Sequence, residues 1–282
     1  MIRPRELSRD VALFAARTPT LPPATHTNSY ALGSRDVIVV EPATPFDDER
    51  QAFAEWIRGL PSQGRRAVAM FATHHHPDHV GTIDLARELG LPLWMHAETA
   101  ARLPGVVCDR ALADGDELAL DGPVPTVWTA LHTPGHAAGH VCLWEKTQRT
   151  LIAGDMVASV GTILIAPGEG HMRTYLAQLA RLEALDARLA LPAHGEPIDA
   201  PSALFRRYIE HRGLREQKVR AAVSAGEGTL ADLVALAYDD TPPSIWPFAM
   251  MSLEAHLVKL VEDGEVTLRD GRYRADSTAQ RT

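Results

Sequence analysis

The sequence of 282 residues predicts a mixed α/β (α+β) fold followed by a small domain of helices and a hairpin. Over residues 1–200, short apolar runs typical of strands alternate with amphipathic helical patterns in two rounds, which fits a four-layer αββα sandwich. From residue 202 the texture changes and helical patterns dominate. We therefore expect a main domain over residues 1–200, a linking helix over 201–225, a winged-helix-like accessory domain over 226–276 and a disordered tail over 277–282.

The first elements are expected after a start that is rich in proline and arginine. Residues 1–25 show no clear periodicity, so we expect them to lie along the surface of the main domain. The apolar run 37–40 predicts a strand. Residues 47–60 carry apolar side chains at helical spacing and a glycine near their end, which predicts a helix.

The most informative stretch is the histidine-rich loop over residues 73–81. Four histidines and an aspartate lie between His74 and His79, directly after the apolar run 67–71, which predicts a buried strand. Imidazole and carboxylate groups are good ligands for divalent cations. Pro77 fixes its own φ angle and removes a backbone donor, so the strand ends in a shaped loop, and we expect a helix to open at Val80. A rigid loop between strand and helix suits a metal site better than it suits a surface histidine cluster.

A second round of elements follows this loop. Strands are expected at residues 91–95, 117–120, 126–131, 141–144, 150–153 and 189–191, and helices at residues 98–103 and 175–185. The turn signal over residues 114–116 separates the early elements of this round from the later strands. The later strands would complete the second half of the sandwich.

The C-terminal region contains three predicted helices and a hairpin. Residues 202–223 predict one long helix, and Thr229 with Asp232 resembles a capping box that opens the next helix. Residues 248–262 predict a third helix, and Asp270-Gly271 is a strong two-residue hairpin signal. The long helix has a basic face formed by Arg206, Arg207, Arg212, Arg215, Lys218 and Arg220.

Composition excludes several classes of protein. The formal net charge of −8 gives no electrostatic reason to expect a nucleic-acid backbone as partner. The two cysteines do not form a disulfide framework. The start of the chain lacks an apolar core long enough for a signal peptide, and no stretch approaches the ~20 apolar residues of a membrane span. We therefore expect a cytoplasmic protein without a membrane partner.

The spacing His74-x-His76-x-Asp78-His79 resembles the signature of the metallo-β-lactamase superfamily. If the resemblance holds, a histidine, an aspartate and a histidine must follow in this order at strand ends. The segments 133–136, 153–155 and 192–195 supply His136, Asp155 and His194 in that order. Residues 27–32 resemble the early strand of the family.

The resemblance extends to the C-terminal region. His211-Arg212, Arg215-Glu216 and the later segment 255–257 resemble the C-terminal extension of the lactamase-beta-like subfamily. In that subfamily the extension is a winged-helix unit, and some members are endoribonucleases while relatives are thioesterases.

The resemblance implies a dinuclear metal site. The first metal ion would be held by His74, His76 and His136, the second by Asp78, His79 and His194, and Asp155 would bridge the two ions. His75 is the histidine of the loop without a ligand role. Zinc fits a histidine-rich set best, and manganese and iron are also compatible with these ligand types. Asp78 and Asp155 would be the catalytic carboxylates that orient a hydroxide bridging the metals.

Three further residues are candidates for the surroundings of the metal ions. Glu41 stands where the family carries an aspartate behind the ligands, so it would support the site without binding metal. The segment 156–171 is long, rich in small residues and leaves directly from Asp155, and such loops often contact substrate. Thr162 and His171 are therefore candidate substrate residues.

Three functions remain open from the sequence. The first is a dinuclear metal-dependent hydrolase that uses a metal-bridging hydroxide on an ester, thioester or phosphodiester, with a small-molecule or carrier-linked substrate. Asp155 resembles thioesterases and nucleases of the family more than dedicated β-lactamases. The second is an endoribonuclease acting on single-stranded RNA, for which the basic helix is the candidate surface. The third is a non-catalytic, metal-stabilised binding protein. A homodimer is also open.

Overall fold

The computed structural model describes residues 4–276 and divides the chain into two compact units. The first unit comprises residues up to 133, 137–162 and 185–201. The second comprises residues 134–136, 163–184 and 202–276. The boundaries expected from the sequence remain a proposal, and the expected tail, 277–282, lies outside the described residues.

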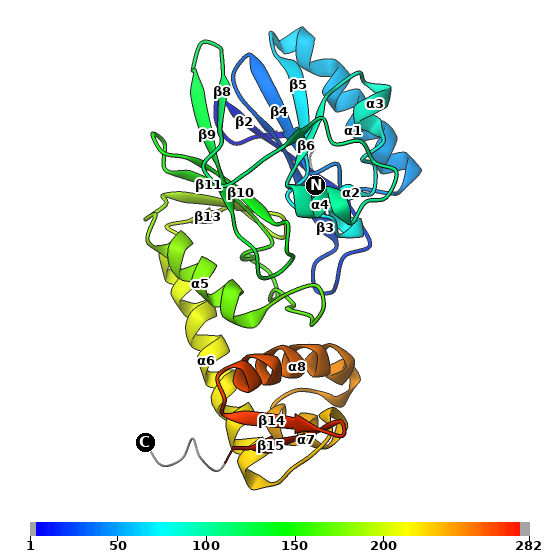
Figure 1. Cartoon of the computed structure of the whole chain (residues 1–282). Helices are drawn as coiled ribbons and strands as arrows, with labels where there is room; N and C mark the ends of the chain where they lie inside the picture. The colour runs from blue at the N-terminus through cyan, green and yellow to red at the C-terminus, as the bar shows by residue number, and fades with distance from the viewer. Residues whose placement is uncertain (1–3, 277–282) are drawn as a thin grey trace. The chain divides into compact units, whose positions relative to one another are not determined.

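The first sheet of unit 1 has seven strands that pair in sequence order (Figure 1). They are β1 (Arg5–Glu6), β2 (Val11–Arg17), β3 (His26–Leu32), β4 (Asp36–Val40), β5 (Arg66–Phe71), β6 (Leu93–Met95) and β7 (Arg110–Ala111). The pairs from β1 to β4 are antiparallel, and those from β4 to β7 are parallel. The expectation that residues 1–25 lie on the surface is wrong for β2, whose residues 11–16 are all buried. A strand covered on both faces is apolar throughout, so it shows no alternation.

The second sheet packs against the first through an apolar layer. Its order is β13 (Ile198–Asp199), β12 (Leu189–Pro192), β11 (Thr150–Gly154), β10 (Val141–Glu145), β9 (Thr126–His132) and β8 (Glu117–Leu120), and only β11 and β12 pair in parallel. Tyr30 and Phe71 from the first sheet and Trp128 and Leu143 from the second belong to one buried cluster. The Tyr30 hydroxyl donates to the carbonyl of Pro192 at 2.8 Å, which joins the two sheets next to the end of β12.

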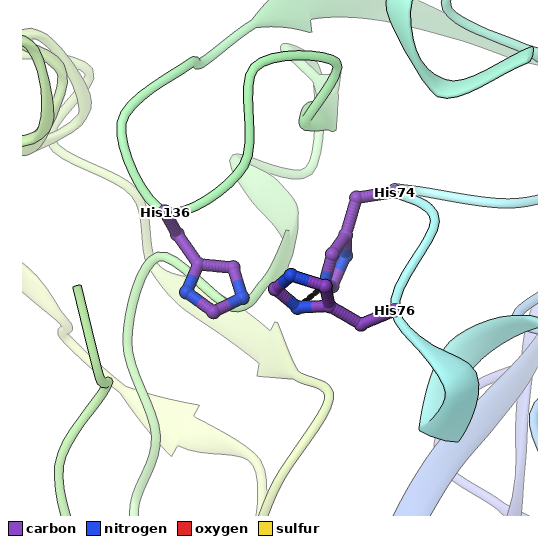
Figure 2. A group of neighbouring side chains, drawn as sticks. All are labelled: His74, His76 and His136. Atoms are coloured by element: carbon purple, nitrogen blue, oxygen red, sulfur yellow. Dashed lines mark hydrogen bonds between the residues drawn. The ribbon is translucent and has the colours of Figure 1, made fainter. Parts of the chain in front are cut away.

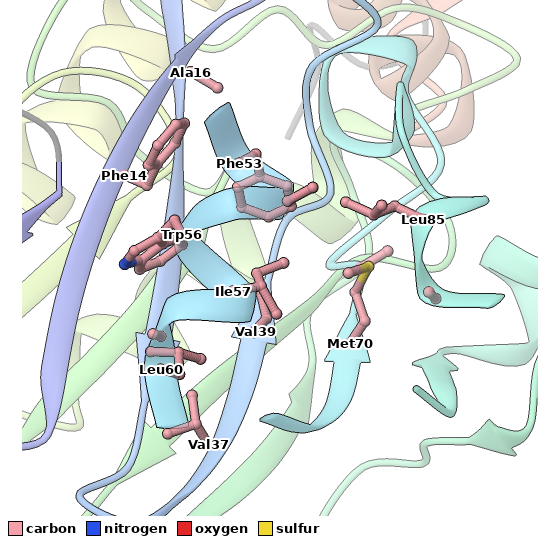
Figure 3. Packing of buried hydrophobic residues seen from close by; sticks show 14 of the residues in the cluster. Phe14, Ala16, Val37, Val39, Phe53, Trp56, Ile57, Leu60, Met70 and Leu85 are labelled. Carbon is pink, nitrogen blue, oxygen red and sulfur yellow. The ribbon is translucent and has the colours of Figure 1, made fainter. Parts of the chain in front are cut away.

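Helices cover the outer face of the first sheet. Figure 3 shows α1 (Asp47–Gly59) and the following 3-10 turn (Leu60–Gln63) placing Phe53, Trp56, Ile57 and Leu60 against side chains of β2, β4 and β5. The expected helix opening at Val80 is instead two short helices, α2 (Pro77–Val80) and α3 (Leu85–Glu88). The backbone N–H groups of Gly81 and Thr82 donate to Ala43 and Pro42, so they cannot continue a helix. A further short helix, α4 (Ala97–Ala101), follows β6.

Unit 2 is mainly helical. It contains α5 (Met172–Glu183), α6 (Ser202–Ala225), α7 (Leu230–Ala237), a 3-10 turn (Pro243–Ile245), α8 (Trp246–Glu262), β14 (Val266–Arg269) and β15 (Arg272–Ala275). The predicted capping box is confirmed, because the side chains of Thr229 and Asp232 each accept from the other's backbone N–H. The predicted hairpin is also confirmed, with positive φ at Asp270 and Gly271 as this type of turn requires.

The helices and hairpin of unit 2 share a hydrophobic core of their own. Side chains from α6, α7, α8 and the hairpin form one buried cluster that includes Val219, Leu233, Leu253, Leu257 and Tyr273. Within residues 4–276, no helix combines the length and the apolar character that a membrane span requires.

Candidate metal centre

The candidate ligands follow the carboxyl ends of four strands. The histidine-rich loop follows β5, His136 follows β9, Asp155 comes directly after β11, and His194 lies just beyond β12. Because β11 and β12 are parallel neighbours, Asp155 and His194 leave the second sheet at the same edge. The two stacked sheets thus bring loops from both halves of the chain to one place.

Asp78, His79, Asp155 and His194 form a compact group within unit 1. Nε2 of His79 lies 3.8 Å from Oδ1 of Asp78 and 3.6 Å from Oδ2 of Asp155. Nε2 of His194 lies 3.6 Å from Oδ2 of Asp78 and 3.3 Å from Oδ1 of Asp155. Atoms that bind one tetrahedral cation at about 2.0–2.2 Å are separated by about 3.3–3.6 Å. The four spacings therefore come close to those of ligands around a shared metal ion.

The other ring nitrogen of each histidine is held by an acceptor. Nδ1 of His79 lies 3.1 Å from Oε1 of Glu41, and Nδ1 of His194 lies 3.1 Å from the carbonyl of His26. Nδ1 of His136 lies 2.9 Å from the carbonyl of Leu164. Carbonyl and carboxylate oxygens accept, so these contacts favour the tautomer with hydrogen on Nδ1 and leave the Nε2 lone pair for a cation.

The buried Nε2 atom of His79 tests whether a metal fits this group. It has no hydrogen-bond partner among the described residues, although a buried polar atom without a partner is costly. A divalent cation between His79, Asp78 and Asp155 would satisfy this nitrogen. The donor set of histidine nitrogens and carboxylate oxygens also suits such a cation.

A second histidine group lies beside the first. Figure 2 labels the three histidines expected to hold the first ion: His74 and His76 lie on the histidine-rich loop of unit 1, and His136 belongs to unit 2. Nε2 of His74 and Nδ1 of His76 are 3.0 Å apart. Nδ1 of His74 lies 3.0 Å from Oγ1 of Thr73, so Nε2 is the nitrogen that faces the group. Within unit 1 the structure thus brings together six of the seven ligands expected from the sequence, and His136 lies in unit 2.

Protons compete with cations in this centre. Burial disfavours the charged form of His79, but the carboxylates of Asp155, Glu41 and Asp78 outweigh burial and raise its pKa well above the usual value. Burial also opposes ionisation of Asp155, but His194 and His79 overcome it and hold the pKa of Asp155 well below the usual value. A cation would take the place of the proton between these groups, so metal binding releases protons.

The side chain of Glu41 holds the first residue of the histidine-rich loop in place. Its side chain is buried, and Oε1 and Oε2 accept hydrogen bonds from the hydroxyl and the backbone N–H of Thr73 at 2.5 and 3.3 Å. The residue has φ of 61°, and its carbonyl accepts from the Ser29 hydroxyl. Glu41 therefore contacts both the base of the loop and the ring of His79, and its supporting role for a metal site stays a prediction.

Two supporting residues were not among the candidate site residues. His140 is fully buried; its Nε2 accepts from the backbone N–H of Asp155 at 3.0 Å, and its Nδ1 lies 2.8 Å from Oγ1 of Thr133. A Cβ on Gly154 would lie 2.4 Å from Nε2 of His140, which requires glycine there. Thr73 is the second supporting residue, because it donates to Glu41 and its Oγ1 contacts Nδ1 of His74. The only sequence signal for His140 is its position four residues after His136.

The two candidate substrate residues have different surroundings. Thr162 is exposed. His171 is the N-cap of α5: its Nδ1 accepts from the backbone N–H of Thr174, and its Nε2 lies 2.9 Å from Oε1 of Glu262. The ring of His171 is therefore engaged in capping α5 and in a contact with the carboxylate of Glu262, both within unit 2. A substrate role for these residues stays a prediction.

Two family models match the sequence. The model of the metallo-beta-lactamase superfamily matches residues 22–194, and the model of the beta-lactamase associated winged helix domain matches residues 229–273. Among curated proteins, a beta-lactamase-like protein 2 homolog of Caenorhabditis elegans is 29% identical over 247 residues, which cover 85% of this chain and 80% of that protein. A hydroxyacylglutathione hydrolase of Acidiphilium cryptum is 33% identical over 193 residues, covering 64% of this chain and 73% of that protein.

Solved structures show the same fold. A metallo-beta-lactamase family protein from Thermus thermophilus matches with a TM-score of 0.80 at 24% identity, covering 96% of this chain and 100% of that chain. A beta-lactamase domain protein from Burkholderia ambifaria also gives a TM-score of 0.80, at 21% identity over 97% of this chain and 93% of its own. The predicted family and fold class, including the C-terminal winged helix, are confirmed by these matches.

Proposed function

The chain belongs to the metallo-beta-lactamase superfamily, and from this premise we propose that it is a hydrolase that uses two divalent cations to cleave a thioester or ester. The observation that carries the proposal is the spacing of His79, His194, Asp78 and Asp155, with Nε2 of each histidine 3.3–3.8 Å from both carboxylates. Burying two carboxylates and two imidazoles this close together costs free energy unless a bound cation compensates their charge.

The residues of the chain would hold and orient the reacting groups. When bound, the cations supply Lewis acidity and lower the pKa of a water molecule toward ~7. Asp155 would fix the positions of His79 and His194 relative to each other, because its Oδ2 faces His79 and its Oδ1 faces His194. The carboxylate of Asp78 is partly exposed, so it can accept a proton from the attacking water and pass it on to the leaving group.

A thioester is the sharper form of the proposal. Water would add to the acyl carbon, the carbon–sulfur bond would break, and the proton removed from water would pass to the thiolate. The relative from Acidiphilium cryptum is named a hydroxyacylglutathione hydrolase, and an acylglutathione is a thioester. An aspartate at position 155 resembles both the thioesterases and the nucleases of the family more than its dedicated β-lactamases, so it is compatible with a thioester without selecting it over a phosphodiester.

The alternative of an endoribonuclease has weaker support. Four basic side chains of α6 already pair with carboxylates: Arg206 with Glu183, Arg215 with Asp240, Lys218 with Asp239 and Asp240, and Arg220 with Glu216 and Glu265. A charge that is paired within the protein offers little to a phosphate backbone. A non-catalytic binding protein would not need all seven candidate ligands, so the complete set argues against this alternative.

One experiment tests the proposal. The purified protein would be stripped with a chelator, reloaded with zinc, manganese or iron, and analysed for metal content beside a panel of acyl thioesters, esters, lactones, phosphodiesters and single-stranded RNA. We expect close to two metal ions per chain and metal-dependent release of a thiol. A protein that binds no divalent metal, or that binds two and cleaves only RNA, would contradict the proposal.

A further inference from the structure

Arg212 is a buried arginine on α6. Its side chain is almost fully excluded from solvent, and its guanidinium donates a hydrogen bond from Nη2 to the carbonyl of Ile163. The guanidinium carbon also lies 5.9 Å from the centre of the Tyr175 ring on α5. Burying a guanidinium costs free energy because the group loses its hydration, unless hydrogen bonds within the protein compensate the loss. All three residues belong to unit 2.

The next carbonyl along the chain holds a metal ligand. The carbonyl of Leu164 is the acceptor for Nδ1 of His136, at 2.9 Å. Two adjacent carbonyls of one short segment therefore have separate partners, the guanidinium of Arg212 and the imidazole of His136. Because peptide units are planar, fixing the Ile163 carbonyl leaves only the φ and ψ angles of Leu164 to orient the next one.

Arg212 is also connected to the residue before His136, through the ring of Tyr175. Tyr175, whose ring lies near the guanidinium, packs with its backbone against Gly135, so that a Cβ on Gly135 would lie 2.4 Å from the Tyr175 Cα. The backbone N–H of His171, just before α5, donates to the Gly135 carbonyl at 2.7 Å. Gly135, the residue before His136, is therefore in close contact with α5. Helix α5 in turn packs along α6 in unit 2 (Figure 1).

We infer that Arg212 is a positioning residue for His136 that acts through the Ile163–Leu164 backbone and the ring of Tyr175. The inference rests on the proposed function only in treating His136 as a metal ligand. Groups that hold the second nitrogen of a ligating histidine fix its tautomer and ring orientation, and their loss typically weakens metal binding about 10- to 100-fold. Helix α6 would then support a metal ligand through one of its residues, without supplying a ligand itself.

The first test compares Arg212→Met with a matched control. Arg215 lies on the same helix, stands over the ring of Tyr238 at 4.1 Å and donates to the carbonyl of Ala237, but it contacts neither the Ile163–Leu164 segment nor Tyr175 through these bonds. We expect Arg212→Met to weaken zinc affinity about tenfold in chelator competition, Arg212→Lys to fall between it and the wild type, and Arg215→Met to retain wild-type affinity. Equal losses in Arg212→Met and Arg215→Met would overturn the inference, because they would indicate general destabilisation.

A double-mutant cycle shows whether the effect passes through His136. In a His136→Ala background, Arg212→Met should cause no further loss of affinity, whereas additive losses would contradict the inference. If Arg212→Met fails to fold, the cycle is carried out with Arg212→Lys, with the same criteria.

Nitrogen NMR of the metal-free protein separates this inference from the proposed function. We expect His136 to carry its proton on Nδ1 in the wild type and to show a mixture of tautomers in the Arg212 variants. An unchanged tautomer would overturn the inference even if metal binding is normal. A wild-type protein that binds no metal would overturn the proposed function, while the tautomer would still report on Arg212.

Discussion

Oε1 of Glu41 lies 3.1 Å from Nδ1 of His79, and both side chains are almost completely buried. The same carboxylate accepts from the hydroxyl and the backbone of Thr73, the residue that opens the histidine-rich loop. One acidic group at the end of β4 therefore fixes both a ligand ring and the start of the loop that presents the ligands. A carboxylate in this position also makes the imidazole a stronger donor to a metal ion.

Replacing Glu41 by Gln should weaken metal binding without unfolding the protein. The amide keeps the size of the side chain but loses its charge and can present an N–H to Nδ1 of His79. We expect affinity to fall about 10- to 100-fold, as measured by chelator competition. Glu145→Gln is the control, because Glu145 is a buried acid at the far end of β10 that accepts from the backbone of Gln148. Equal losses in both variants would argue against a specific role for Glu41.

Asp155→Asn should abolish hydrolysis while the fold is kept. Each oxygen of Asp155 faces a different histidine, and the amide nitrogen of asparagine cannot bind a cation in place of one of them. We expect turnover to fall at least about 1,000-fold, since residues that act as one unit lose nearly everything when one member is removed. Activity and metal content are measured beside a circular dichroism spectrum. Full activity in this variant would refute the mechanism.

The sequence predicted the site better than the surroundings that hold it. Six of the seven candidate ligands lie together within unit 1, whereas His136 belongs to unit 2, and the ligand roles of all seven stay predictions. The carbonyls of His26 and Leu164, which hold His194 and His136, have no sequence signal, because every residue carries a carbonyl and only the fold decides which one comes close. The same limit applies to Arg212, whose basic neighbours suggested an exposed face.

Errors in the predicted elements have a common physical origin. β2 is covered on both sides, with Phe14 in the layer beneath α1 and Leu13 in the layer between the sheets, so its sequence shows neither alternation nor helical spacing. The break between α2 and α3 follows from hydrogen bonds of Gly81 and Thr82 to a segment about 40 residues earlier. Long-range contacts of this kind override local propensity.

His76→Ala and His75→Ala should differ in metal content. The ring centre of His76 lies 4.5 Å from that of His74, with Nδ1 of His76 3.0 Å from Nε2 of His74, whereas the ring centre of His75 lies 6.4 Å from that of His74. We expect His76→Ala to lose about one equivalent of metal and most activity, and His75→Ala to retain both. Metal analysis after dialysis provides the comparison. Loss of a metal ion from His75→Ala would mean that the ligands are assigned to the wrong histidines.

Glu216 should make the stability of unit 2 sensitive to acid. Burial disfavours its carboxylate, but His256, Lys259 and Arg220 outweigh burial and lower the pKa of Glu216 from 4.5 to about 2. Because the pKa is depressed in the folded state, the stabilisation is complete above pH 4.5 and is lost as the pH falls toward 2. It amounts to at most about 3 kcal/mol. Urea unfolding of the wild type and of Glu216→Gln should therefore differ at pH 7 and converge near pH 2. A difference that does not change with pH would contradict this account.

The basic side chains of α6 should matter for stability and not for substrate choice. Arg215 and Lys218 pair with Asp240 at 3.0 and 2.9 Å. Reversing both to glutamate places like charges together, so we expect the midpoint of thermal unfolding to fall by about 5 °C and turnover of every substrate to change in the same proportion.

If the helix instead binds RNA, the double reversal would selectively weaken RNA cleavage. The affinity of the wild type for RNA would then fall steeply with salt, with a log–log slope of about −0.7 for each phosphate contact, because each contact releases condensed counterions. Measuring RNA affinity from low to high salt, beside thioester turnover in both proteins, distinguishes these outcomes. A steep salt slope with unchanged thioester turnover would favour the nuclease.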